Sequence, residues 1–173
     1  MALKTIFNRL KNEKKKELSY AQMLNGSLPV FSQFGNDVFA SDIVEACIRT
    51  KATEISKLQP KHIFTDENGL QSVQKDSINR LLRFGPNELM TTKDFLEKCT
   101  WLHEKTYNCF IYPQYETRWI NGEKTKYYTG FYPLNPTEVD FLEDGHGKLY
   151  VQFHFLNSDS VLLPYDEVIH WRK

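Results

Sequence analysis

Apolar residues recur three or four positions apart in two segments between residues 41 and 84, which is the spacing of an amphipathic helix. Ser41 is a suitable N-cap for the first segment, and Pro60 ends it. Residues 62–64 are predicted to form a short strand that is closed by turn residues. The second segment, 76–84, ends before a Gly-Pro-Asn sequence. We therefore predict two helices joined by a short strand.

A third helix is predicted to begin at Thr91. Thr91-x-x-Asp94 is a variant of the capping box, in which the hydroxyl accepts from the amide of Asp94 and the carboxylate reaches back to the N-cap amide. Apolar residues and His103 share one face of the helix that follows, up to Thr106. Trp101 lies well off this apolar face. Because exposed large apolar groups usually have partners, Trp101 is a candidate subunit-interface residue.

From Tyr107 onward the apolar period changes to two, which is typical of strands. Asn121-Gly122 is a two-residue hairpin signal, because a type I′ turn needs positive φ at both central residues. With this turn, Trp119 faces Lys124. Further strands are predicted over 138–142, 149–155, 161–163 and 168–171. Because helices precede antiparallel strands, the fold class is α+β, with three main helices packed on an antiparallel β-sheet, a meander of hairpins.

The clearest alternation along these strands lies in residues 149–155. Alternate side chains of a strand point to opposite faces of the sheet. The residues predicted to face the core are Leu149, Val151, Phe153 and Phe155. The residues predicted to face outward are Tyr150, Gln152 and His154.

The N-terminal 39 residues differ in composition from the rest of the chain. A lysine-rich stretch is followed by an Asn-, Gly- and Ser-rich stretch, in which Val30, Phe31 and Phe34 are the apolar anchors. We predict an irregular, partly disordered N-terminal arm over residues 1–39 and one α+β domain over residues 40–173.

Charge is balanced overall but unevenly distributed. Lys+Arg and Asp+Glu number 22 each, for a formal net charge of zero. Residues 1–20 carry six basic side chains against two acidic ones, and residues 134–167 carry seven acidic side chains against Lys148 alone. The basic head is open to two interpretations, a solvated amphipathic arm or a nucleic-acid contact. Opposite charge at the two ends would also suit head-to-tail packing of identical subunits.

Composition excludes several classes of protein. A hydrophobic content of 40% rules out a wholly disordered chain, and no apolar run approaches the roughly 18 residues of a membrane span. Residues 1–17 lack the apolar core of a signal peptide, so an intracellular protein is expected. The 3 cysteines are too few for a disulfide framework, and the glycine-rich nucleotide-binding motifs are absent from the sequence.

The candidate chemistry is limited to one cysteine–histidine pair. Cys99 and His103 lie at i, i+4 on the predicted third helix, which is metal-ligand spacing, and Cys109 or His154 could approach them. The same pair would suit a nucleophile and its base, or simply the core face of the helix. A small thiol or metal enzyme is therefore kept as an alternative. The prediction is a protein without enzyme activity, catalytic residues, cofactor or metal.

The predicted hairpin around Asn121-Gly122 gathers basic and aromatic side chains. Arg118, Lys124 and Lys126 surround it together with Trp119 and two tyrosines, which suits stacking on bases and contact with phosphates. The alternative is a cross-strand ladder in which Lys124 covers Trp119. We keep the three basic residues as candidate nucleic-acid contacts and Trp119 as a second candidate subunit-interface residue.

Four segments carry a resemblance to a known family. They are Ser41–Arg49 with Ile55, Leu58 and Pro60; Leu81–Thr92 with Phe95; Phe131–Pro136 with Val139; and Leu163–Arg172. In this order they resemble the N-terminal, wing-like part of tailed-phage portal proteins of the HK97 type, over about residues 40–173. The family's Gly-Asn-Ala-Tyr stretch reads Thr-Tyr-Asn-Cys here and retains the Asn as Asn108.

The resemblance implies a structural virion component, found in the virion and the host cytoplasm. Full-length relatives form a ring, usually a dodecamer, at one capsid vertex, through which DNA is packaged and ejected. The implied partners are other portal subunits, the capsid, the terminase and DNA, with no membrane.

The stem, clip and crown of such proteins have no counterpart in this sequence. The resemblance therefore implies a fragment, whether expressed as such, cut by a protease or left in a prophage. A stable interface usually buries roughly 1,200–2,000 Å². Without the stem, we expect the chain to be a monomer or a weak oligomer in dilute solution.

Overall fold

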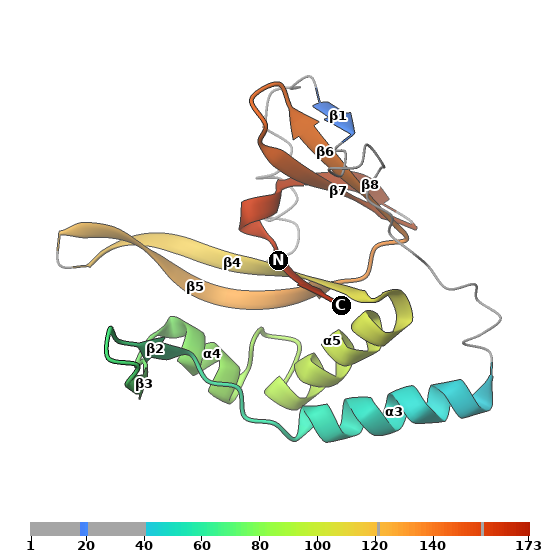
Figure 1. Ribbon diagram of the computed structural model, residues 1–173, viewed down its shortest axis with the longest axis horizontal. Helices are drawn as coiled ribbons and strands as arrows, with labels where there is room; N and C mark the ends of the chain where they lie inside the picture. Colours follow the sequence, from blue (N-terminus) through green and yellow to red (C-terminus); the bar gives the residue numbers. More distant parts are fainter. Residues whose placement is uncertain (1–17, 21–40, 121, 157) are drawn as a thin grey trace. The chain divides into compact units, whose positions relative to one another are not determined.

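The protein is described by a computed structural model that covers residues 18–20, 41–120, 122–156 and 158–173 (Figure 1). The chain divides into two compact units. Of the described residues, the first unit holds 18–20 and 135–169, and the second holds 41–134 and 170–173. Apart from residues 18–20, the predicted N-terminal arm with its apolar anchors lies outside the described residues.

Three helices belong to the second unit and confirm the three predicted helices. They are α3 (Asp42–Ser56), α4 (Ser77–Phe84) and α5 (Thr92–Thr106). The predicted capping box starts α5: the Thr91 hydroxyl accepts from the amide of Asp94, and the Asp94 carboxylate accepts from the amide of Thr91. Asp76 caps α4 by accepting from the amide of Asn79. Helix starts capped in this way are typically stabilised by about 1 kcal/mol.

The first helix is shorter than its sequence pattern. The helix ends at Ser56, whereas the helical pattern in the sequence continues up to Pro60. The Ser56 hydroxyl donates to the carbonyl of Thr53, and proline disfavours helical geometry in the residue before it. At the other end Ser41 occupies the N-cap position, but its side chain makes no capping hydrogen bond.

A long hairpin forms the sheet of the second unit. It consists of β4 (Asn108–Ile120) and β5 (Glu123–Leu134), and the last strand, β9 (Ile169–Arg172), lies beside β4. Trp119 pairs with Lys124 in the predicted register. Gly122 has a φ of 83°, the left-handed geometry that the turn requires. The far end of this hairpin extends beyond the helices of the same unit (Figure 1).

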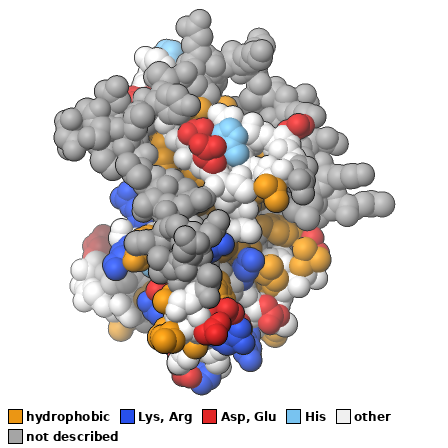
Figure 2. All heavy atoms as spheres, turned by 90° about the vertical axis from the view of Figure 1, so that its right-hand side faces the viewer, with side chains coloured by type: hydrophobic (Ala, Val, Ile, Leu, Met, Phe, Trp, Pro, Cys, Tyr) orange, Lys and Arg blue, Asp and Glu red, His pale blue; other side chains and the backbone are white. Residues whose placement is uncertain are grey.

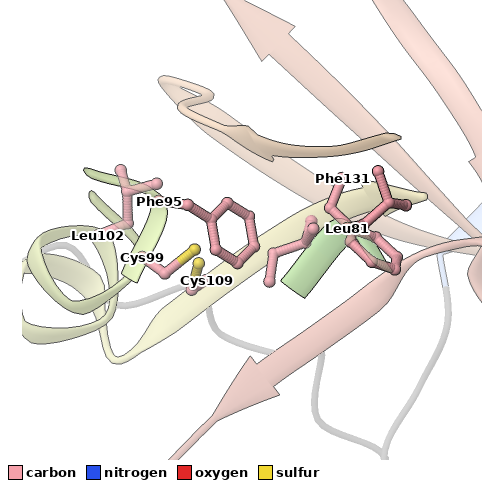
Figure 3. Packing of buried hydrophobic residues seen from close by; sticks show 7 residues of the cluster. Leu81, Phe95, Cys99, Leu102, Cys109 and Phe131 are labelled. Atoms are coloured by element: carbon pink, nitrogen blue, oxygen red, sulfur yellow. The ribbon is translucent and has the colours of Figure 1, made fainter. Parts of the chain in front are cut away.

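The core of the second unit lies between the hairpin and two of the helices. α4 and α5 pack against β4 and β5, while α3 packs mainly against α5. The buried cluster consists of Leu81, Phe95, Cys99, Leu102, Cys109, Ile111 and Phe131 (Figure 3). Fully burying one of its larger side chains contributes roughly 1.5–3 kcal/mol. A separate two-stranded sheet, β2 (Ile63–Thr65) with β3 (Gln71–Val73), follows α3 and includes the strand predicted there.

The first unit is a four-stranded antiparallel sheet. Its strands, in the spatial order β1-β6-β7-β8, are Leu18–Tyr20, Glu138–Asp144, Leu149–Phe155 and Ser158–Pro164. A short 3-10 turn, η1 (Tyr165–Glu167), follows β8. The predicted α+β class is confirmed, but the strands of the predicted meander divide into three sheets.

The predicted facing of β7 is wrong at its start. Tyr150, predicted to face outward, is 1% exposed, and Leu149, predicted to face the core, is 40% exposed. Tyr150 lies opposite Leu142 and Pro164, and Leu142 is buried as well. Val151, which points to the opposite face from Tyr150, is 0% exposed, so both faces of this inner strand are covered here. Simple alternation holds only where one face meets solvent.

Candidate functional site

The far end of the β4–β5 hairpin is exposed and carries most of the predicted site residues. Trp119 is 75% exposed, so Lys124 does not cover it although the two are cross-strand partners. The Arg118 guanidinium lies 3.7 Å from the ring centroid of Tyr127, and the Lys126 ammonium lies 4.3 Å from that of a tyrosine on β4. These contacts hold the hairpin as a ladder of cations stacked on aromatic rings.

The charge of this hairpin end is nearly balanced. A nitrogen of the Arg118 guanidinium donates to the Glu116 carboxylate over 2.9 Å. Glu123 stands next to Lys124, and both are exposed. Phosphate binding depends on excess positive charge, whereas exposed tryptophan is typical of residues that dominate protein interfaces. The hairpin end therefore favours a protein contact at Trp119, and a nucleic-acid contact by Arg118, Lys124 and Lys126 stays a prediction.

The other tryptophans behave differently from Trp119. Trp101, the other predicted interface residue, is half-buried on α5. Trp171 stacks on the ring of His103 with the centroids 4.8 Å apart. The sequence analysis missed this pair because His103 and Trp171 lie on elements that are distant along the chain.

The structure places the predicted cysteine–histidine pair in the core. The thiols of Cys99 and Cys109 lie next to each other (Figure 3). A hydrogen bond with Cys109 and burial raise the pKa of the Cys99 thiol, so the thiol stays protonated and is a poor nucleophile. His103 is stacked on the tryptophan of β9, and His154 is bonded to Asp140 in the other unit. Among the described residues, no group of three or more His, Cys, Asp or Glu side chains could hold a metal ion.

One pair of the resembling segments meets at the edge of the hairpin. The Phe131 amide donates to the carbonyl of Pro86 over 2.7 Å, and the Asn87 side-chain amide donates to the carbonyl of Phe131 over 2.8 Å. The Asn87 side-chain oxygen accepts from the amide of Leu89 over 2.9 Å. The loop between α4 and α5 is thereby fixed onto β5.

The last of these segments, Leu163–Arg172, contacts β4 where the last strand joins the sheet. The Nε2 of His170 lies 2.8 Å from the side-chain oxygen of Asn108, and the His170 ring stacks on Phe110 with the centroids 4.2 Å apart. Burial, with a smaller contribution from Arg172, lowers the pKa of His170 to about 4. His170 is therefore neutral near pH 7, and its Nε2–H donates to Asn108.

Most of the chain matches one protein family. Residues 42–173 match the family model described as phage portal protein. The chain belongs to the phage portal protein family. This family consists of structural virion proteins that serve DNA packaging. A comparison with curated proteins gives no match.

In this portal-family chain the matched span contains the four resembling segments except for Ser41, the first residue of the first segment. We call the hydrogen bond of Asn87 to Phe131 and that of His170 to Asn108 the two joints of the second unit. None of the helices in the described part of the chain is long and apolar enough to cross a membrane.

A groove of about 920 Å³ collects basic side chains that are far apart in the sequence. It lies between the end of α3, β3, α4 and the start of α5, and we call it the basic groove. Its basic lining residues are Lys57, Lys61, Lys75, Arg80, Arg83 and Lys93. The acidic residue among the described lining residues, Asp76, caps α4 and also contacts Nδ1 of His62 over 2.5 Å. The sequence analysis missed this surface because several separate segments build it.

Proposed function

We propose that this chain is part of a portal subunit and contributes to the portal vertex ring through which phage DNA is packaged and ejected. The match of residues 42–173 to the phage portal protein family is the observation that carries this proposal. In this role the chain supplies geometry and contact surfaces and performs no covalent chemistry. It acts in the virion and, during assembly, in the host cytoplasm, next to other portal subunits and the capsid.

The genes beside the one that encodes this chain test the proposed role. A portal gene is expected to have neighbours that encode a terminase large subunit and a major capsid protein. Antibodies raised against the chain should label a single vertex of purified phage particles. Housekeeping neighbours, or label spread evenly over the capsid, would contradict the proposal.

We further propose that the hairpin end around Trp119 contacts a neighbouring subunit. An indole that is 75% exposed on a nearly neutral surface supports this contact, because burying it gains apolar area at a small electrostatic cost. Trp101, which is half-buried, is proposed as a secondary contact. The chain alone is expected to be a monomer or a weak oligomer, since one hairpin end falls short of the area that a stable interface usually buries.

Sedimentation velocity at rising protein concentration tests the contact at Trp119. We expect weak association of the unmodified chain and weaker association of Trp119→Ser. Leu156→Ser is the control, because Leu156 is 83% exposed in the other unit. Association that is equal in Trp119→Ser and the unmodified chain, or a stable dodecamer formed by both, would refute the role of the hairpin.

A further inference from the structure

Several cations of the basic groove form no ion pair within the described part of the chain. Among the described residues, Lys61, Lys75 and Arg80 form no ion pair, whereas Lys57 is paired with Glu54 over 2.5 Å. Like charges within a Debye length of roughly 8–10 Å repel one another, so the groove gains free energy when an anionic partner binds. On the face drawn in Figure 2, basic and acidic side chains are both visible among the described residues.

Apolar side chains are exposed among these cations. Leu58 is 61% exposed, Val73 54% and Phe84 73%, and all three line the groove. Exposed apolar patches that are rimmed by polar residues often mark sites of protein interaction. The groove therefore offers two kinds of contact to one partner, electrostatic and apolar.

The lining argues against a nucleic acid as the occupant. Phosphates would use the cations, but a nucleic-acid backbone has no counterpart for Leu58 and Val73. Single strands are bound by stacking successive bases on several aromatic rings. Phe84 is the aromatic residue among the described lining residues, and the Arg83 guanidinium lies over its ring at 5.2 Å.

The strand beside the groove has room for an extended segment. β3 pairs only with β2 in a two-stranded sheet of the described residues, and its last residue, Val73, lines the groove. A two-stranded sheet is marginally stable by itself in water, and an added strand satisfies its free edge.

We propose that the basic groove binds an acidic, amphipathic segment of a partner protein. The carboxylates of this segment lie against Lys61, Lys75 and Arg80, and its apolar side chains lie against Leu58 and Phe84. This inference does not depend on the ring contact proposed for the hairpin, because the two surfaces lie on different elements of the unit.

Fluorescence anisotropy with a labelled peptide of alternating glutamate and leucine tests the proposal. We expect binding that weakens as salt is added, because the contact is partly electrostatic. Three further probes isolate the two kinds of contact. They are a lysine–leucine peptide, a glutamate–serine peptide and an oligothymidine of equal length. All three are expected to bind about tenfold more weakly or worse, a difference of about 1.4 kcal/mol in binding free energy.

Variants locate the binding on the molecule. Lys75→Glu/Arg80→Glu should weaken the glutamate–leucine peptide about tenfold or more, since two attractions become repulsions. Phe84→Ser should weaken it without changing its salt dependence. Lys98→Glu/Lys105→Glu makes the same change of charge at exposed positions of α5 outside the groove and should leave binding unchanged. Thermal melting verifies that each variant is folded.

Several results would overturn the proposal. One such result would be that the glutamate–leucine peptide does not bind. Another would be that the control substitutions on α5 weaken its binding as much as the groove substitutions do. Equal binding of the glutamate–serine peptide would show that charge alone acts. Equal binding of the oligothymidine, unaffected by Phe84→Ser, would make the groove a phosphate site instead.

Discussion

Replacing Asn87 by alanine should destabilise the second unit by about 2 kcal/mol. The substitution removes the donor to the carbonyl of Phe131, a residue that is 6% exposed, and leaves this oxygen without its partner. A buried acceptor without a partner costs about 1–3 kcal/mol. The amide of Leu89 also loses its acceptor, but Leu89 is 68% exposed and water replaces the bond. The backbone bond from Phe131 to Pro86 is retained.

Urea unfolding and thermal melting measure this effect. At this chain length, 2 kcal/mol corresponds to a fall in Tm of about 4–8 °C. Asn87→Asp is the informative second variant, because its carboxylate can still accept from the amide of Leu89 but cannot donate to Phe131. We expect Asn87→Asp to be destabilised at least as much as the alanine variant at pH 7. The control is Asn135→Ala, an exposed position where a change within about 0.5 kcal/mol is expected.

The reasoning would be refuted by either of two results. If Asn87→Ala unfolds at the same urea concentration as Asn135→Ala, the loop does not need this bond. If Asn87→Asp restores the stability lost in Asn87→Ala, the bond to Leu89 matters and the bond to Phe131 does not.

Three further outcomes are expected. Gly130→Ala should lower the unfolding free energy measured by urea titration by about 1–3 kcal/mol, because a Cβ at this position would lie 2.7 Å from the packed ring of Tyr132. A change below about 0.5 kcal/mol would contradict this close contact. The pKa of His170 is about 4 in the folded chain and about 6.5 in the unfolded chain, so stability that is present above pH 6.5 should be lost as the pH falls towards 4. The variant His170→Gln should lose less unfolding free energy over this pH range. Equal losses for both proteins in urea titrations would exclude this cause. Cys47 is exposed and should react fast with a thiol reagent, whereas the two buried thiols should react only on unfolding. Fast reaction of all three thiols would place the buried pair outside the core.

The features predicted correctly from the sequence depend on neighbouring residues. The capping box at Thr91 and Asp94 needs two side chains three positions apart, and the register of Trp119 with Lys124 follows from the turn between them. Such signals can be read without knowing the rest of the fold. The same local reasoning located the three helices to within a few residues.

The features that the sequence analysis missed depend on residues brought together by folding. Tyr150 and Val151 point to opposite faces of their strand and are both buried, so both faces are covered there, which alternation along a single strand does not encode. The last strand leaves the sheet of its preceding strands and joins β4, where His170 meets Asn108. The basic groove is built by cations from position 57 to position 93, and no window of sequence contains a basic run there.

Asn87 and Asn108 stabilise the second unit, whereas Trp119 is proposed to contact a neighbouring subunit. Asn87 donates its side-chain N–H to the carbonyl of Phe131, and Asn108 accepts from His170 through its side-chain oxygen. These bonds hold a loop and a strand to the hairpin. Trp119 is 75% exposed and contributes little to the folded unit. Substitution at the joints should therefore change the free energy of unfolding, and substitution at Trp119 should change association alone. A structural protein needs this separation, because a subunit must be stable before it meets its neighbours and its contact surfaces must stay exposed until it does.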